Sequence, residues 1–317
     1  MPLAIHADDV RQAAVRIRPL ARRTPVMTSA GFDARAGAQV FFKCENLQRG
    51  GAFKIRGASN LVLSLSGEEL ARGIVAYSSG NHAQAVAIAA RHVGAHATIV
   101  MPEDAPRLKM ESTRSYGATI VTYNRHTESR EAIADALIRE SGATVVPPFD
   151  HPMIMAGQGT AALELLQEAG HLDALITPVG GGGLLAGCAT IAKDLDRAIR
   201  VFGAEPEGAN DTFLSLQAGH QVTVAHPDTI ADGLRSPRPG NLTFPVIQSL
   251  AEQILTVSED QIRATVKFLL LRLKILVEPS GAVPAAAVLF GKLPKEIRSV
   301  GVVLSGGNVD FEDLARY

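Results

Sequence analysis

The feature that most constrains the fold of this chain is a regular alternation of short β-rich runs with amphipathic helical segments. In the first half of the chain the β-rich runs are 73–77, 97–101 and 119–122. After Pro147-Pro148, which marks a hinge or boundary, the runs are 174–179, 200–204 and 299–304. Parallel strands need a long crossover between them, and an α-helix is its usual form. The sequence therefore predicts an α/β fold of two doubly wound lobes with mainly parallel sheets.

Helical periodicity places the connecting elements. Helices are expected over residues 8–20, 54–65, 83–93, 106–116, 126–141, 157–169, 184–195, 258–273 and 280–290. A further strand is expected over 39–45, and residues 206–243, rich in Pro, Gly and Asp, are expected to be irregular.

Composition narrows the classes of function. The chain has 317 residues, 46% of them hydrophobic, which is enough for two cores. Its net charge of -1, with acids and bases interleaved, argues against a nucleic-acid or anionic-lipid partner. With two cysteines, Cys44 and Cys188, and an apolar run 268–277 broken by Arg272 and Lys274, we expect a cytoplasmic protein without a membrane span.

Lys54 is the candidate covalent catalyst. It stands between an aromatic residue and small residues in Gly51–Ala58, at the expected start of a helix. Desolvation lowers the pKa of a lysine and makes its amine nucleophilic. The simpler interpretation, a solvated surface lysine, is the more common case for a lysine taken alone.

A run of four glycines, Gly180–Gly183, lies between an expected strand and an expected helix. Its backbone N–H groups can converge on an anion, and a phosphate is the natural occupant. A P-loop is excluded because Leu184-Leu185 follows in place of Lys-Ser/Thr. A dinucleotide fingerprint, Gly181-x-Gly-x-x-Ala186 with Glu205 after the next strand, stays open as an alternative.

Two further polar motifs follow expected strands, where ligands of parallel sheets bind. They are Ser78–His82 and Ser305–Asn308. An ordinary helix cap is the simpler account of the first motif. The loop from Glu205 to Asp211 combines acidic side chains with a backbone carbonyl, which suits a hard cation, although a solvated acidic loop would look the same.

Taken together, these motifs resemble one family, the fold-type II pyridoxal-phosphate (PLP) enzymes, in the branch of serine and threonine dehydratases and serine racemase. The resemblance rests on Glu45–Gln48, Phe53–Ala58, Ser78–His82, Gly157–Thr160, Gly180–Gly183, Ala231–Gly233 and Leu304–Asn308. It implies a tryptophan synthase β-like fold, with residues 73–149 as a small domain inserted into a large PLP-binding domain of residues 1–72 and 150–317.

The resemblance also implies a cofactor site. Lys54 would form the Schiff base with the aldehyde of PLP, Phe53 would pack near the ring, Asn81 would meet the ring hydroxyl, and Ser305 would face the pyridine nitrogen. The phosphate would lie on the glycine run. Further cofactor contacts are implied for Gly180, Gly181, Gly182, Gly183, Gly233 and Glu278.

Substrate and cation sites follow in the same way. The substrate carboxylate would be bound by Ser78, Ser79, Asn81 and His82, and Ser79 would serve as the acid/base of a racemase. Met153 stands where asparagine or aspartate is more usual, and its thioether would favour an apolar substituent on the substrate. A divalent cation, Mg²⁺ or else Ca²⁺ or Mn²⁺, would be held by Glu205, Ala209 and Asp211.

The implied reaction is a dehydration of a β-hydroxy amino acid that yields a 2-keto acid and ammonia. Serine, threonine and 3-substituted serines such as 3-hydroxyaspartate or 3-phenylserine are candidate substrates. Serine racemisation is the main alternative. An NAD-binding oxidoreductase and a catalytically idle binding protein are more distant, and a homodimer is expected from the family.

Overall fold

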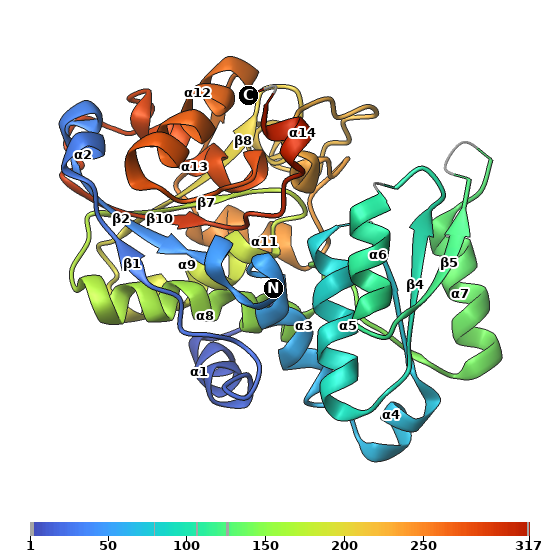
Figure 1. The fold of residues 1–317 in the computed structure, drawn as a ribbon. Coiled ribbons are helices and arrows are strands. Elements are labelled where there is room, and N and C mark those ends of the chain that lie inside the picture. The colour runs from blue at the N-terminus through green and yellow to red at the C-terminus, as the bar shows by residue number, and fades with distance from the viewer. Residues whose placement is uncertain (1–2, 79, 106, 125–126, 316) are drawn as a thin grey trace.

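The computed structural model describes all residues except 1–2, 79, 106, 125–126 and 316 (Figure 1). Its larger sheet has six strands in the order β1-β2-β10-β7-β8-β9. These strands are β1 (Val26–Met27), β2 (Gln39–Cys44), β7 (Ala174–Pro178), β8 (Arg200–Pro206), β9 (Gln253–Val257) and β10 (Ser299–Leu304). All neighbours are parallel except the short edge strand β1, which pairs antiparallel with β2.

Helices cover both faces of this sheet (Figure 1). One face packs against α1 (Ala7–Arg16), α8 (Pro152–Ala169), α9 (Gly183–Leu195) and α11 (Thr243–Leu250). The other face packs against α2 (Ala30–Ala36), α12 (Glu259–Phe268), the π-helical turn Leu269–Leu273 and α13 (Pro279–Leu289). The central strands are buried on both sides, as expected for a doubly wound parallel sheet.

The smaller sheet has four parallel strands in the order β5-β4-β3-β6. They are β3 (Ile74–Tyr77), β4 (Ala97–Pro102), β5 (Thr119–Tyr123) and β6 (Thr144–Val145), and the helices around them are α4 (Gly67–Arg72), α5 (Asn81–Val93), α6 (Arg107–Ser115) and α7 (Arg130–Ser141). All four strands lie within residues 73–149, and the boundaries of an inserted domain there stay a prediction.

Helix α3 (Lys54–Val62) lies where the two lobes meet (Figure 1). It contacts α8 of the large lobe and α5 of the small lobe. Its buried residues Ile55, Ala58 and Val62 belong to the same hydrophobic cluster as Ile74. The helix that begins with Lys54 is therefore shared between both lobes.

The structure confirms the predicted α/β class and most elements, with a few differences. Helix α8 begins at Pro152 instead of residue 157, because the His151 side chain accepts a hydrogen bond from the Met153 N–H and caps the helix earlier. Helix α7 begins at Arg130, where Ser129 caps it. The region expected to be irregular contains α10 (Asp211–Ala218). Strand β9 was not predicted, nor was α11.

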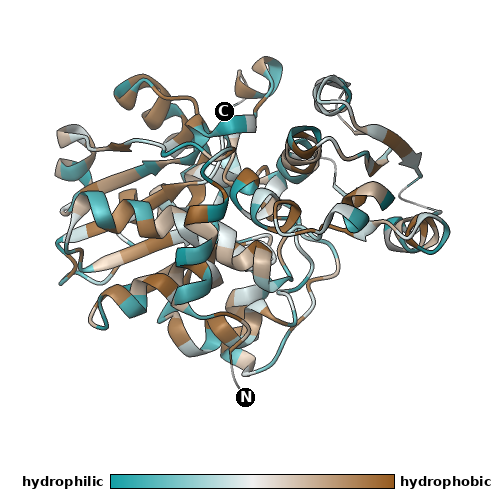
Figure 2. Ribbon diagram, turned by 90° about the horizontal axis from the view of Figure 1, so that it is seen from below, coloured by the Kyte–Doolittle hydropathy of each residue, from teal (hydrophilic) through white to brown (hydrophobic). Residues whose placement is uncertain are grey.

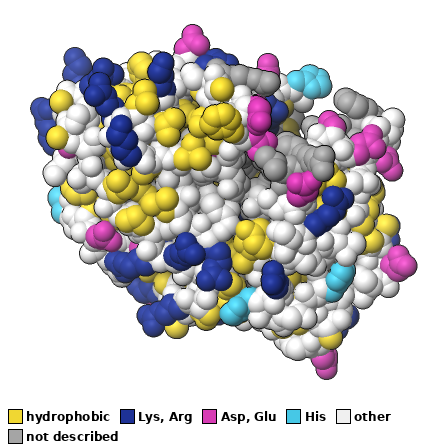
Figure 3. All heavy atoms as spheres, viewed as in Figure 1, with side chains coloured by type: hydrophobic (Ala, Val, Ile, Leu, Met, Phe, Trp, Pro, Cys, Tyr) yellow, Lys and Arg dark blue, Asp and Glu magenta, His cyan; other side chains and the backbone are white. Residues whose placement is uncertain are grey.

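Hydrophobic residues are concentrated on the strands and on the helix faces turned toward them (Figure 2). The face drawn in Figure 3 carries both basic and acidic side chains. Within the part of the chain that is described, no helix is long and apolar enough to span a membrane.

Candidate active site

The segment before Lys54 is fastened to the loop that follows β10. The Phe53 N–H donates to the Ser305 carbonyl, with an N to O distance of 2.9 Å. One residue away, Ala52 forms an antiparallel β-bridge with Gly306. The structure thus brings together two predicted motifs, those of Lys54 and Ser305, from opposite ends of the chain.

The Lys54 amine has no acidic partner among the described side chains. Its Nζ donates to the backbone carbonyl of Pro148 at 2.7 Å and lies 5.2 Å from the centroid of the Phe53 ring. Burial lowers the pKa of Lys54 to about 8. A buried ammonium without a counter-charge is disfavoured, so a useful fraction of the amine is neutral and nucleophilic near neutral pH.

The glycine run turns the chain from β7 into α9. Gly182 has a φ of +91°, which favours glycine, and it precedes the first helical residue, Gly183. A side chain at Gly181 would overlap the ring of Phe149. The Gly181 carbonyl accepts a hydrogen bond from the Thr243 hydroxyl, with an O to O distance of 2.7 Å, which fixes the loop.

This loop fits a phosphate group. The first N–H groups of α9 have no partner within the helix, and the helix dipole favours negative charge there. Gly233 lies against the same loop, since a Cβ at Gly180 would be 3.3 Å from the Gly233 carbonyl oxygen. The Gly233 N–H is itself 3.0 Å from the Ser280 hydroxyl oxygen.

Asn81, the first residue of α5, is held from two sides. Its Nδ2 donates to the Glu278 carboxylate at 2.7 Å, and its Oδ1 accepts from Asn308 Nδ2 at 2.9 Å. Asn308 Nδ2 also donates to the Gly50 carbonyl at 2.7 Å. Two predicted cofactor residues, Asn81 and Glu278, are therefore in direct contact. Asn308 was missed as an individual site residue, although its motif was recognised.

The rest of the Ser78–His82 motif has a mixed placement. The Ser78 hydroxyl accepts from the Gly80 N–H at 3.3 Å, while Ser79 lies outside the described residues. The His82 ring is buried, with its Nε2 2.8 Å from the Val146 carbonyl, so Nε2 carries the proton. Burial, aided by the charge of Lys54, lowers the pKa of His82 to about 3, and the ring stays neutral. Its role in binding a substrate carboxylate stays a prediction.

Met153 and Phe149 occupy different surroundings. The Met153 side chain packs against the hydrophobic cluster that contains Ile55 and Ala58 of α3. The ring of Phe149 instead lies on the glycine run, against Gly181. The proposed effect of Met153 on substrate choice stays a prediction. Phe149 is a site-lining residue that sequence reasoning missed, because it belongs to none of the recognised motifs.

Two buried carboxylates lie at the start of α10. The Glu205 carboxylate accepts from the N–H groups of Thr212 and Phe213 at 3.1 and 2.9 Å. Both carboxylate oxygens of Asp211 are buried without a hydrogen-bond partner among the described residues. Burial raises the pKa of Asp211 to about 7, and burial together with the charge of Asp211 raises that of Glu205.

Such a pair fits a divalent cation, because buried carboxylates without a cation are strongly disfavoured. The described residues contain no group of three or more His, Cys, Asp and Glu side chains that could hold a metal. The ligand set would therefore need backbone oxygens, as predicted for the buried residue Ala209.

A buried ionic cluster supports α3 below Lys54. The Arg56 guanidinium bonds the Glu45 carboxylate at 2.7 Å and the Glu164 carboxylate of α8 at 2.7 Å. Lys43 also pairs with Glu164 at 2.6 Å. Burial alone would raise the pKa of Glu45, but the charge and hydrogen bonds of Arg56 lower it overall. The cluster fixes α3 to the large lobe two residues after the reactive amine.

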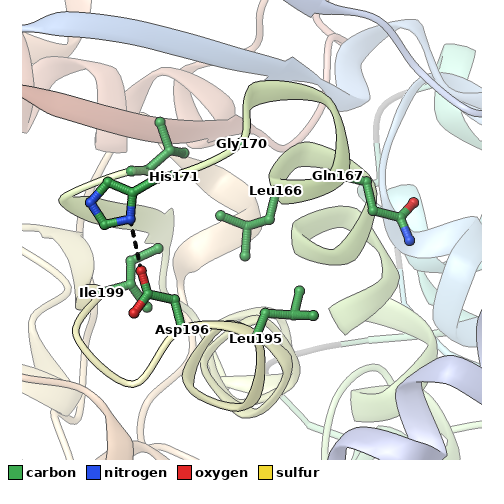
Figure 4. Close-up of a pocket in the computed structure, with 8 residues that line it drawn as sticks. Leu166, Gln167, Gly170, His171, Leu195, Asp196 and Ile199 are labelled. Atoms are coloured by element: carbon green, nitrogen blue, oxygen red, sulfur yellow. Dashed lines mark hydrogen bonds and ion pairs between the residues drawn. The ribbon is translucent and has the colours of Figure 1, made fainter.

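A separate open pocket of about 380 Å³ lies at the far ends of α8 and α9 (Figure 4). It is lined by Leu166, Gln167, Gly170, His171, Leu172, Leu195, Asp196 and Ile199. The His171 and Asp196 side chains interact across it at 2.9 Å. The Lys54 site lies at the opposite, N-terminal ends of these helices, so this pocket is not part of it.

Comparison with known proteins agrees with this geometry. A family model described as "Pyridoxal-phosphate dependent enzyme" matches residues 17–306. The chain is 48% identical over 307 residues to L-threo-3-hydroxyaspartate ammonia-lyase from Saccharomyces cerevisiae, covering 97% of this chain and 94% of the relative. It is 44% identical over 310 residues to serine racemase from Schizosaccharomyces pombe, covering 98% and 96% of the two chains.

Solved structures give the same result. The maize serine racemase structure superposes with a TM-score of 0.96 at 42% identity, covering 99% of this chain and 96% of that chain. A threonine deaminase from an organism abbreviated "T.th." superposes with a TM-score of 0.90 at 44% identity, covering 96% and 99%.

These findings confirm the predicted fold, the PLP cofactor and the predicted enzyme class. They leave no support for the dinucleotide alternative, since the Glu205 carboxylate it needs is buried and bonded to the backbone of α10. The lysine at the head of α3, the glycine loop and the full-length similarity together place this chain in the family of pyridoxal-phosphate dependent enzymes.

Proposed function

We propose that this enzyme eliminates water from L-threo-3-hydroxyaspartate and releases ammonia from the product. The observation that carries the proposal is the Lys54 amine, held at 2.7 Å on the Pro148 carbonyl, in a chain 48% identical to two L-threo-3-hydroxyaspartate ammonia-lyases. Loss of water from this substrate gives an enamine, and hydrolysis of the enamine releases ammonia and leaves oxaloacetate.

The roles of the residues follow from their positions. When bound, PLP supplies an electron sink that stabilises negative charge on the substrate Cα. Lys54 anchors the cofactor and, once free, removes the Cα proton, for which its lowered pKa is suited. The glycine run Gly180–Gly183 holds the phosphate. Asn81, fixed between Glu278 and Asn308, orients the ring.

Other residues would set the electronics and bind the substrate. The Ser305 hydroxyl, which is neutral, would face the pyridine nitrogen and would not keep it protonated. Ser78, Ser79 and the backbone at the start of α5 would receive the substrate carboxylate, since the first N–H groups of a helix bind anions.

Product analysis tests the proposal. The purified holoenzyme should convert L-threo-3-hydroxyaspartate to equal amounts of oxaloacetate and ammonia, with a higher kcat/KM than for serine, threonine or 3-phenylserine. Lys54→Ala should fold and lose the reaction. A preference for serine over hydroxyaspartate would contradict the assignment of substrate.

Racemisation of serine is the second candidate function, favoured by 44% identity to serine racemase over 98% of the chain. It would use Lys54 on one side of the substrate and Ser79 on the other. Chiral analysis of the serine pool during turnover measures it, and Ser79→Ala should abolish D-serine formation while retaining keto-acid production.

The proposal extends to the surroundings of the enzyme. We infer that Glu205, Asp211 and the Ala209 carbonyl bind Mg²⁺, with Ca²⁺ or Mn²⁺ as substitutes, and that the enzyme is a cytoplasmic homodimer. Size-exclusion chromatography with light scattering tests the dimer, and imaging of a tagged chain tests the location.

A further inference from the structure

The Gly157–Thr160 motif contains a buried glutamine to which the reaction above assigns no task. Gln158 lies in α8 and is 1% exposed. A Cβ at Gly157 would be 2.5 Å from the Arg56 carbonyl oxygen of α3, and one at Gly159 would be 2.5 Å from the Gly187 carbonyl oxygen of α9. The two glycines therefore let α3 and α9 approach α8 closely on either side of Gln158.

The side chain of Gln158 spans the gap between these two helices. Its Cγ is 3.1 Å from where a Cβ at Gly57 would stand, on the helix that carries Lys54. Its Oε1 is 2.6 Å from where a Cβ at Gly183 would stand, at the start of α9. Its Nε2 donates to the Pro148 carbonyl at 3.3 Å. Because a carbonyl only accepts hydrogen bonds, the amide nitrogen must face Pro148 and the oxygen must face Gly183.

The Pro148 carbonyl thus has two donors, and Lys54 is the other. Lys54 Nζ donates to it at 2.7 Å, a shorter contact than that of Gln158. When Lys54 is bonded to the cofactor, its nitrogen no longer donates to Pro148 as a free amine, and Gln158 is the donor that remains. When a substrate amine displaces Lys54, the lysine returns to the carbonyl.

We propose that Gln158 is a positioning residue for Lys54, which stabilises the cofactor-bonded state of the lysine by keeping the Pro148 carbonyl satisfied. This inference rests on the proposed role of Lys54. Without the amide, the carbonyl would lack a donor in the cofactor-bonded state but would regain one from Lys54 in the displaced state. Loss of the amide should therefore favour displacement of Lys54 by an incoming amino acid.

The test uses glycine, which has no β-hydroxyl and cannot undergo elimination. Binding of glycine to the wild-type holoenzyme is followed by the absorbance change of bound PLP when the amine displaces Lys54. Gln158→Met keeps the length and packing of the side chain but removes the donor. It should lower the apparent dissociation constant for glycine by about three- to tenfold, the range expected for one hydrogen bond.

Gln167→Met, the same replacement near the exposed end of α8, is the matched control and should bind glycine as the wild type does. If Gln158→Met does not fold, Gln158→Leu is measured instead. A folded Gln158 variant with an unchanged or raised glycine constant would overturn the inference, because a residue that only packs would give that result. If instead Lys54→Ala retains the wild-type PLP spectrum, the role of Lys54 itself fails and the inference falls with it.

Discussion

At the scale of single residues, the enzyme depends on amines and carboxylates removed from water without a matching charge. Lys54 faces a neutral carbonyl, and Asp211 faces no hydrogen-bond donor among the described residues. Burial shifts the pKa of each group toward its neutral form. These shifts lead to two measurable pH dependences.

The first concerns the loading of the apoenzyme with PLP. Only the neutral Lys54 amine attacks the aldehyde, and its pKa is lowered to about 8, so the protonated form dominates below that pH. The rate of PLP attachment should therefore rise about tenfold per pH unit below pH 8 and level off above it. Stopped-flow absorbance measures this, and a profile that keeps rising to pH 10 would show an ordinary lysine.

The second concerns the carboxylate pair at α10. Mg²⁺ added to chelator-treated enzyme should raise Tm at pH 8, because the cation binds only the folded state. The raised pKa of Asp211, about 7, keeps this group protonated at pH 5.5, so the increase in Tm should shrink there. In Asp211→Asn it should disappear at both pH values. Differential scanning fluorimetry with calcium and sodium as comparison ions measures the effect, and an undiminished response of the variant would exclude this site.

At the scale of elements, the position of α3 depends on polar contacts in the interior. Arg56 is fully buried between Glu45 and Glu164, and removing one partner leaves an unpaired charge in the core. Glu45→Gln should lower the free energy of unfolding by about 3 kcal/mol. Urea denaturation measures the loss.

The matched control for this prediction is the exposed pair Arg263 and Asp260, 3.4 Å apart on α12. Asp260→Asn should change the free energy of unfolding by less than about 1 kcal/mol, because surface pairs contribute little. Equal effects of the two substitutions would mean that the interior cluster contributes no more than a surface pair.

The contact between α8 and α9 gives a further prediction. A Cβ at Gly187 would overlap the Met155 carbonyl of α8, whereas a Cβ at Gly67 would meet nothing within 4 Å. Gly187→Ala should lower the free energy of unfolding by about 1–3 kcal/mol, and Gly67→Ala should be neutral or slightly stabilising. Because α9 begins with the phosphate loop, Gly187→Ala should also weaken PLP binding, which titration of the apoenzyme by PLP fluorescence would reveal.

At the scale of the whole molecule, the sequence predicted the class of fold and the residues that meet at the site. The strands of both sheets, apart from β1, β6 and β9, and the polar motifs that follow them, came from local periodicity and glycine placement. Strand β9 was missed because it is short and lies at the sheet edge. The Arg56 cluster and the Pro148 contact were missed because they join distant segments, and a backbone carbonyl leaves no signal in the sequence.

Helix α3 packs against α8 of one lobe and α5 of the other, and it begins with Lys54. Any swing of the small lobe over a bound amino acid would have this helix near its pivot. Enclosure of the substrate and aim of the amine would then be one mechanical event, so a ligand too short to draw the lobes together would also leave the lysine badly directed.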